Sequence, residues 1–236
     1  MKVLAFGDVH APEYLPLLLS SLKRLSATEV SAVLIAGDVV KKGNYRMCAP
    51  VQDALRRALP NASIVAVFGN EDYPDVREKM REECQEVIWL DDDYVRLPLE
   101  KELVVVGTTG ALDKPTRWQL EHVPNVHELY ASRLKKIAEL ISQHAGKELT
   151  VLLTHYPPRC RTLVGEKEEF WEEMSSKKLS EVVRKHPVDA VVHGHLHESK
   201  IHSDFIGQTP VYNVALPAIK QVRIIEVRPI GLVGFM

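Results

Sequence analysis

The sequence lacks the features that mark disulfide-rich and membrane proteins. Its three cysteines, Cys48, Cys84 and Cys160, are an odd number at wide spacing with no CxxC pair, a pattern that predicts reduced intracellular thiols. No stretch approaches the ~18 apolar residues of a membrane-spanning helix. The apolar run before Asp8 is shorter than that of a secretory signal. These absences favour a cytoplasmic protein without a membrane partner.

An excess of charge of either sign is also missing. The 30 lysines and arginines are intermixed with 32 acidic residues, so the formal net charge is only -2. Tight binding of nucleic-acid backbones normally needs a basic surface, and nucleic acid is therefore not the expected partner. The chain has no GxSxG motif and no Walker A loop, which argues against serine-based acyl transfer and against nucleotide binding through a P-loop.

The chain does contain short apolar runs that alternate with helical or turn-rich segments, which is typical of an α/β fold. Its 236 residues, 45% of them hydrophobic, suit one domain over residues 1–236, because no repeat or linker divides them. The clearest predicted helix covers about 126–145, with Asn125 as N-cap and Gly146 after its end. Further helices are predicted near 13–26, 50–59, 74–84 and 175–186. Strands are predicted at 2–6, 31–37, 63–69, 86–90, 102–109, 149–154, 189–192, 210–216 and 222–227.

Five of the predicted strands end in side chains that commonly bind metals. In α/β folds the carboxyl ends of neighbouring strands meet at one crevice, so these residues are expected to converge although they span almost 190 positions. In extended segments residues i and i+2 face the same side, so each DxH or HxH pair can point into one site. The residues concerned are Asp8, His10, Asp38, Asn70, His155, His195 and His197.

The number of donors predicts more than one metal ion. A single catalytic zinc typically takes about three protein ligands, whereas two ions about 3.5–4 Å apart need roughly six or seven, with one carboxylate between them. The seven donors are of mixed oxygen and nitrogen type, without thiolate. Such a set favours two divalent or trivalent transition-metal ions, Mn first, with Fe, Zn, Ni or Co as alternatives.

The ordered motifs GDVH, GD, GNE, TH and GHLH, between residues 7 and 197, resemble those of the calcineurin-like metallophosphoesterase superfamily, which are DxH, GDxx, GNH(D/E), H and GHxH. The resemblance implies a four-layer α/β/β/α sandwich of two mixed β-sheets with a dinuclear site at the strand ends. His193 matches no ligand position, and we expect it to be satisfied inside the core. The resemblance places one ion on Asp8, His10 and His197 and the other on Asn70, His155 and His195, with Asp38 bridging them.

The activity that the resemblance implies is hydrolysis of a phosphate ester by a hydroxide that bridges the two ions. Asn70 and Glu71 occupy the catalytic positions, but Glu71 stands where the family has a histidine that assists the leaving group. A carboxylate there would repel a dianionic monoester more than a diester, or would act as a general acid if its pKa were raised. Lys41 and Lys42 replace the Asp-Arg pair of the family's protein serine/threonine phosphatases, which argues against that activity.

We therefore expect a metal-dependent phosphoesterase that acts on a small phosphodiester or nucleotide-like phosphate ester. Arg117 and Arg159 are candidate substrate-binding residues, with solvated surface arginines as the alternative. A nuclease of the same superfamily and a catalytically silent metal-binding scaffold are the alternative functions. The balanced charge disfavours the nuclease, and the complete ligand set disfavours the scaffold. The apolar tail 229–236 favours a last core strand, with a contact in a homo-oligomer as the alternative.

Overall fold

The computed structural model describes residues 1–25 and 30–231, and these residues form two mixed β-sheets. In the first sheet the strand order is β11-β1-β2-β3-β4, and the edge strand β11 runs antiparallel to β1 while the others are parallel. Its strands are β1 (Lys2–Phe6), β2 (Ala32–Ala36), β3 (Ser63–Val67), β4 (Val87–Leu90) and β11 (Arg223–Glu226).

The second sheet has the strand order β5-β6-β7-β8-β10-β9. Its four inner strands are parallel, and each edge strand is antiparallel to its neighbour. The strands are β5 (Asp93–Leu97), β6 (Leu103–Thr108), β7 (Leu149–Thr154), β8 (Ala190–His193), β9 (Ser203–Ile206) and β10 (Thr209–Asn213).

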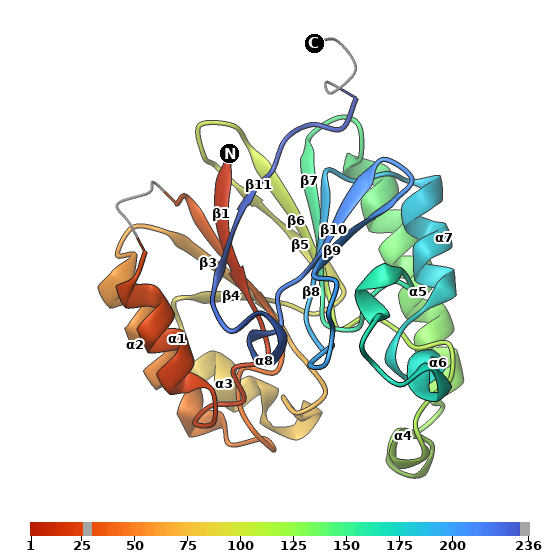
Figure 1. The fold of residues 1–236 in the computed structure, drawn as a ribbon, viewed down its shortest axis with the longest axis horizontal. Coiled ribbons are helices and arrows are strands. Elements are labelled where there is room, and N and C mark those ends of the chain that lie inside the picture. Colours follow the sequence, from red (N-terminus) through yellow and green to blue (C-terminus); the bar gives the residue numbers. More distant parts are fainter. Residues whose placement is uncertain (26–29, 232–236) are drawn as a thin grey trace.

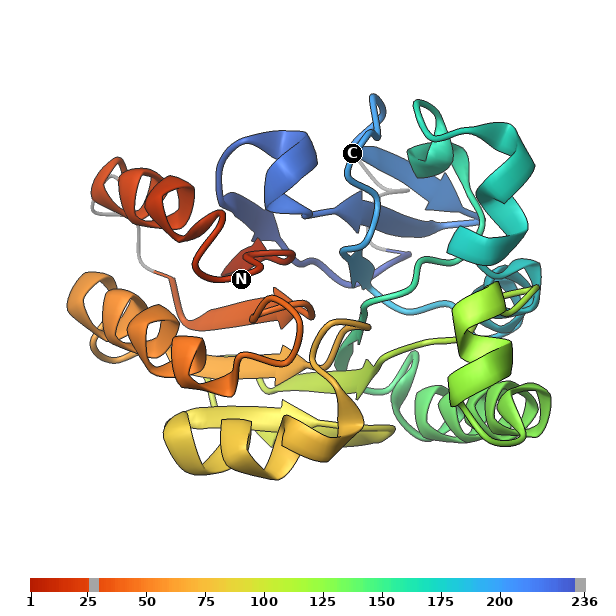
Figure 2. The ribbon, with the colours of Figure 1, turned by 90° about the horizontal axis from the view of Figure 1, so that it is seen from below.

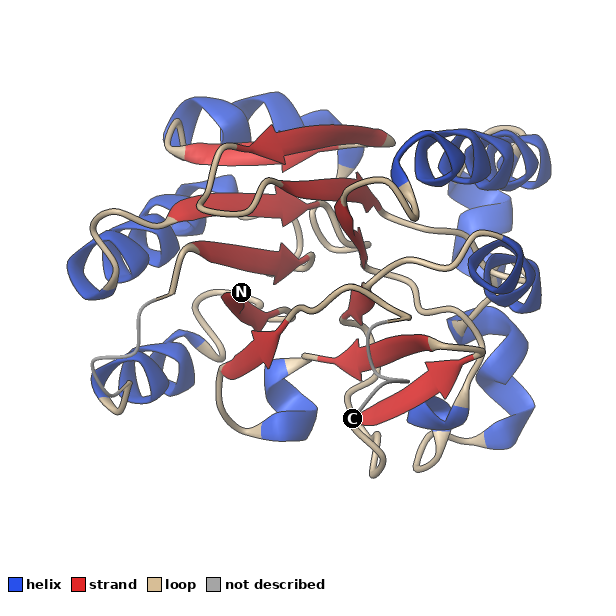
Figure 3. Ribbon diagram, turned by 90° about the horizontal axis from the view of Figure 1, so that it is seen from above, coloured by secondary structure: helices blue, strands red, loops and turns tan. Residues whose placement is uncertain are grey.

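Helices cover the outer face of each sheet, as Figure 1 and Figure 3 show. The helices α1, α2 and α3 lie on the side of the first sheet, and α5 and α7 lie on the side of the second. The helices are α1 (Leu15–Lys23), α2 (Cys48–Ala58), α3 (Arg77–Glu83), α4 (Arg117–His122), α5 (Val126–His144), α6 (Trp171–Met174), α7 (Lys177–Lys185) and α8 (Leu216–Ile219). Short 3-10 turns occupy Tyr45–Met47, Pro74–Val76, Arg161–Leu163 and Glu168–Phe170.

Three apolar layers hold the four structural layers together. Because side chains alternate along a strand, Leu4 and Phe6 of β1 pack against the helices, whereas Val3 and Ala5 pack against the second sheet. In the second sheet Leu152 faces α5 and α7. The predicted four-layer α/β/β/α sandwich is therefore confirmed. The assignment of residues 1–236 to a single domain stays a prediction.

All nine predicted strands are present, and two edge strands were not predicted. The strands β5 and β9 each bury only one side chain, and neither has the apolar run that marked the others. The long helix begins at Val126 as expected, but Asn125 has a left-handed φ of 51° and its side chain makes no capping hydrogen bond. Residues 26 and 232–236, parts of a predicted helix and of the apolar tail, lie outside the described residues.

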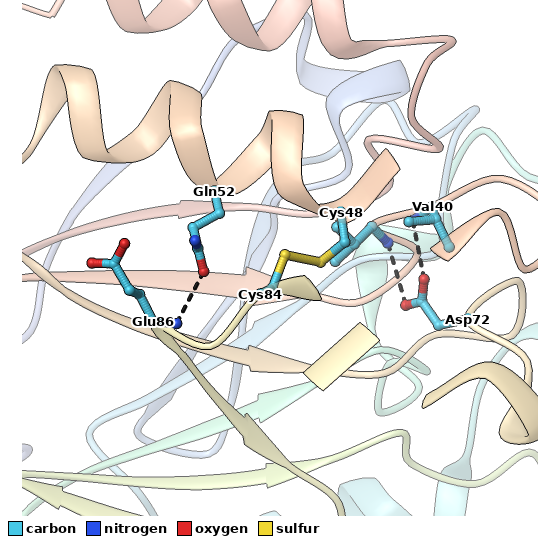
Figure 4. The surroundings of a disulfide bond; sticks show 7 residues. Val40, Cys48, Gln52, Asp72, Cys84 and Glu86 are labelled. Carbon is cyan, nitrogen blue, oxygen red and sulfur yellow. Dashed lines mark hydrogen bonds between the residues drawn. A yellow bond between two sulfur atoms is a disulfide. The ribbon is translucent and has the colours of Figure 1, made fainter. Parts of the chain in front are cut away.

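Cys48 and Cys84 form a disulfide, so the expectation of three reduced thiols is wrong for these two residues. Cys48 starts α2 and Cys84 directly follows α3, and their Cα atoms are 6.2 Å apart across 36 positions of sequence (Figure 4). The pairing depends on the packing of α2 beside α3, which the cysteine spacing does not reveal. Cys160 is a free cysteine. The cytoplasmic location therefore loses part of its basis and stays a prediction.

None of the helices in the described ranges is both long and apolar enough to cross a membrane.

Candidate metal centre

The seven predicted metal ligands lie at the end of the two sheets where the loops after β1, β2, β3, β7 and β8 meet, the end seen from below in Figure 2. The clearest sign is contact between distant segments. His197 Nε2 lies 2.9 Å from Asp8 Oδ1 although 189 positions separate the two residues, and His155 Nε2 lies 2.9 Å from Asn70 Oδ1. The convergence expected from the strand ends is present.

Asp8, His10 and His197 form one group of donors that could hold a metal ion, with donor atoms all within 4.8 Å of one another. His10 Nε2 lies 3.4 Å from His197 Nε2 and 3.8 Å from Asp8 Oδ1. This is the set that the resemblance implied for the first ion.

Asp8, Asp38 and His155 form a second group that meets the same distance limit. The Oδ2 atom of Asp38 lies 3.5 Å from His155 Nε2 and 3.6 Å from His10 Nε2. Asp38 therefore faces both groups, which is the position that a bridging carboxylate needs. The geometry also places Asp8 in both groups, a sharing that the motif spacing did not suggest.

The chemistry of these donors suits a cation. His155 Nδ1 lies 2.9 Å from the carbonyl oxygen of Ala36, which only accepts, so Nδ1 carries the proton and Nε2 presents a lone pair. That lone pair faces Asn70 Oδ1 and Asp38 Oδ2, which are also acceptors. Burial lowers the pKa of His155 and keeps the ring neutral. A proton or a metal ion among these three acceptors would offset their mutual repulsion, so the residues fit a metal ion.

The protonation of the carboxylates supports the same conclusion. Burial and the neighbouring Asp8 carboxylate raise the pKa of Asp38 to about 7. Burial would also raise the pKa of Asp8, but its contacts with His10 and His197 hold that pKa well below its usual range. Burial opposes charge on His10, yet its contact with Asp8 and the field of Asp38 raise the pKa of His10 to about 9. Without a metal ion, protons on His10 and Asp38 offset the negative charge of the cluster. Bound cations would neutralise the carboxylates in their place.

His195 and His193 are neighbours in sequence but have different surroundings. The backbone N–H of His195 donates to Asp8 Oδ2 at 2.9 Å, and its ring lies 5.0 Å from that of His155. His193 Nδ1 donates to the carbonyl of Gly194, and its Nε2 accepts from the Thr162 hydroxyl at 3.1 Å. The His193 side chain is fully buried and has both nitrogens occupied, as expected of a core residue.

The backbone at the centre takes an unusual conformation. Asp8, His10, Asp38 and His195 have positive φ values of 56°, 40°, 48° and 71°. Such residues cost on the order of 1–3 kcal/mol each and persist where the surrounding structure holds them, often at functional sites. Gly194 lets the chain pass close to Asp8, since a Cβ at this position would collide with the Asp8 carboxylate.

Glu71, which replaces the family histidine, contacts a predicted ligand. Its Oε2 atom accepts a hydrogen bond from His10 Nδ1 at 3.2 Å and another from the backbone N–H of Lys42 at 3.0 Å. With Nδ1 held by Glu71, Nε2 is the nitrogen of His10 that faces Asp8 and Asp38, and a metal ion bound there would displace its proton. A carboxylate behind a ligating imidazole is a common way to orient the ring and fix its tautomer.

Asp72 was not singled out from the sequence, although it occupies the last position of the motif GNH(D/E). Its side chain is fully buried. Its carboxylate accepts hydrogen bonds from the backbone N–H groups of Val39 at 3.2 Å and Gly69 at 2.9 Å, and from that of Val40 at 3.0 Å (Figure 4). Asp72 thus ties the loop that carries Asp38 to the loop that carries Asn70.

The two candidate substrate arginines do not line the cavity beside the centre. Arg117 is almost fully exposed and pairs with Glu121 at 2.9 Å. Arg159 pairs with Asp113 at 3.3 Å and donates to Ser175 Oγ. Both charges are therefore already compensated, and a role in substrate binding stays a prediction that these contacts do not support.

A cavity of about 300 Å³ opens beside the centre. Its lining includes Asn70, Glu71 and His195 of the centre together with the aromatic residues Tyr73, Trp118 and Tyr156. The volume is at the lower end of the range of about 300–1,000 Å³ for small-molecule sites.

Comparison with known proteins places this arrangement in a family. The calcineurin-like phosphoesterase family matches residues 1–199, so the chain belongs to that family. Comparison with the curated proteins finds no match.

Solved structures resemble the whole chain at low sequence identity. The phosphopantetheinyl hydrolase of Mycobacterium tuberculosis has a TM-score of 0.72 at 15% identity, covering 97% of this chain and 96% of that one. The protein TT1561 of Thermus thermophilus has a TM-score of 0.62 at 17% identity, covering 96% of this chain and 99% of that one. A putative 5'-nucleotidase from Staphylococcus aureus has a TM-score of 0.57 at 16% identity, covering 90% of this chain and 48% of that one. At these identities the likeness concerns the fold.

Proposed function

We propose that this protein uses two divalent metal ions, Mn first among the candidates, to hydrolyse a small phosphodiester or nucleotide-like phosphate ester. The observation that carries the proposal is the convergence of Asn70 Oδ1 and Asp38 Oδ2 on His155 Nε2, at 2.9 Å and 3.5 Å. Bound metal ions would withdraw electron density from the phosphoryl oxygens and so favour attack on phosphorus.

The side chains divide this task. Asp8, His10 and His197 would hold one ion, and Asp38 would lie between the two. Asn70, His155 and His195 would hold the other. Because Asn70 directs Oδ1 toward His155, its amide NH2 group remains to donate to a phosphoryl oxygen in the cavity.

We assign Glu71 to orientation of His10, because its carboxylate is engaged by His10 Nδ1 and Lys42 N–H. The position then carries no cation that could attract a dianionic monoester or protonate an alkoxide. A diester has one negative charge fewer and suffers less. We expect kcat/KM for an aryl phosphodiester to exceed that for the matching monoester, and the opposite order would contradict this substrate preference.

The test is metal content together with turnover in an Asp38→Asn variant. The wild type should bind two Mn ions per chain and hydrolyse bis(p-nitrophenyl) phosphate. The variant should bind fewer ions and lose turnover, because one carboxylate oxygen of the bridging residue is replaced by an amide nitrogen, which is a poor metal ligand. Asp53→Asn, on the exposed face of α2, is the matched control. Two ions and normal turnover in Asp38→Asn would refute the assignment.

A further inference from the structure

A second cavity, of about 340 Å³, adjoins the one beside the metal centre. The two share five residues in their linings, namely Asn70, Tyr73, Trp118, Gln119 and Tyr156. A group attached to a phosphate at Asn70 would therefore extend into this second cavity.

Aromatic rings form one wall of the second cavity. The rings of Tyr73 and Trp118 are 6.4 Å apart and within 20° of parallel, and those of Trp118 and His122 are 4.7 Å apart and within 10°. Trp118 is 52% exposed, which is a large apolar surface to leave in water. Val126 and Tyr130 add further apolar lining. A planar ring can stack on such a wall.

The charged groups of the second cavity are already compensated. Arg77 pairs with Asp91 at 2.9 Å, and Arg133 pairs with Asp92 at 2.9 Å. The cavity therefore offers no free charge to a second phosphate or to a carboxylate.

One polar group of the lining has no partner. The hydroxyl oxygen of Thr109 is buried and makes no hydrogen bond within the described part of the chain. A buried hydroxyl normally finds a partner, because leaving it unpaired costs free energy. A ligand atom that accepts or donates a hydrogen bond would satisfy it.

We propose that this second cavity binds a neutral, planar heteroaromatic group of the substrate, stacked on Trp118 and hydrogen-bonded at one edge by Thr109. The proposal rests on the proposed function, since the metal centre would hold the phosphate that carries this group. Trp118 and Thr109 are then residues that determine specificity, outside the set that holds the metal ions.

The test compares the binding of phosphonates that carry the same charged group. Binding of methyl-, cyclohexylmethyl-, naphthylmethyl- and quinolinylmethylphosphonate to the Mn-loaded protein is measured by calorimetry, and again as inhibition of bis(p-nitrophenyl) phosphate hydrolysis. The variants are Trp118→Ala, Trp118→Phe and the isosteric Thr109→Val. Phe205→Ala, an exposed aromatic residue on β9, is the control.

Stacking on an aromatic side chain contributes about fivefold to a hundredfold in affinity. We expect the wild type to bind the naphthyl compound at least about tenfold more tightly than the cyclohexyl compound, and Trp118→Ala to remove that difference while Trp118→Phe keeps part of it. The wild type should also bind the quinolinyl compound more tightly than the naphthyl compound, because the ring nitrogen can accept from the Thr109 hydroxyl. Thr109→Val should remove this preference and leave the preference for aromatic rings unchanged. Methylphosphonate should bind all variants alike.

Three adverse outcomes are distinguishable. Equal affinity for all four compounds in every variant, with methylphosphonate bound and the diester hydrolysed, would overturn the cavity assignment and leave the phosphoesterase intact. Absence of methylphosphonate binding and of turnover would instead overturn the proposed function and this assignment with it. An equal preference for the naphthyl and cyclohexyl groups would overturn the stacking.

Discussion

Removal of the Glu71 carboxylate is the most informative perturbation of the centre, because it separates an orienting role from an acid role. Glu71 Oε2 accepts from His10 Nδ1 at 3.2 Å and from Lys42 N–H at 3.0 Å. Hydrogen bonds to charged groups contribute about 1.5–3 kcal/mol, and loss of a partner behind a metal ligand typically costs about 10–100-fold in metal affinity or activity. We therefore expect Glu71→Ala to weaken Mn binding by roughly that factor.

Glu71→Gln should have a smaller effect than Glu71→Ala. The amide oxygen can still accept from His10 or Lys42, but hydrogen bonds without the charge are about half as strong. A loss of about 0.7–1.5 kcal/mol corresponds to roughly a threefold to tenfold weaker affinity. Both variants should lose turnover of aryl and alkyl diesters in the same proportion, because the defect lies in the metal ligand and not in the leaving group.

The assays are Mn titration by calorimetry and kcat/KM for a matched pair of aryl and alkyl phosphodiesters. Glu173→Gln is the control, since Glu173 also lines the cavity but pairs with Lys114 and contacts no predicted ligand. Normal Mn affinity in Glu71→Ala, with a loss confined to the alkyl diester, would refute the orienting role and assign Glu71 as the general acid.

Other predictions concern stability and the residues behind the centre. Asp72→Asn replaces one acceptor oxygen with an NH2 donor opposite backbone N–H groups. It should lower the free energy of unfolding by about 1–3 kcal/mol in urea titration. Unchanged stability would show that the loops carrying Asp38 and Asn70 stay in place without this carboxylate. Cys48→Ser should cost about 3–4 kcal/mol by the loop-closure relation for its 36-residue separation, whereas Cys160→Ser should cost far less, and equal effects would contradict a stabilising disulfide. His193→Ala should lower stability by about 1–3 kcal/mol, because it leaves the Thr162 hydroxyl without its partner, with two Mn ions still bound; loss of one ion would make His193 a ligand.

The inner strands of both sheets, and the convergence of polar residues at their ends, could be predicted from the sequence because buried strands require continuous apolar runs, and the polar residues follow where those runs end. Asp8 and Asp38 each follow such a run after a single glycine, so their place at the carboxyl ends of β1 and β2 was visible in the order of residues alone. The edge strands β4 and β11 keep short apolar runs and were predicted, whereas the edge strands β5 and β9 bury one side chain each, lack such a run and were missed.

The tertiary structure decided which groups meet when they come from separate elements. The disulfide between Cys48 and Cys84 depends on α2 and α3 lying side by side. The orientation of Glu71 toward His10 depends on a carboxylate at one strand end reaching a ring at another. Asp72 likewise acts on backbone N–H groups of Val39 and Val40, and backbone groups carry no sequence signal. Such contacts join residues more than 30 positions apart, and their distances are set by the packing of the layers, which local sequence patterns do not encode.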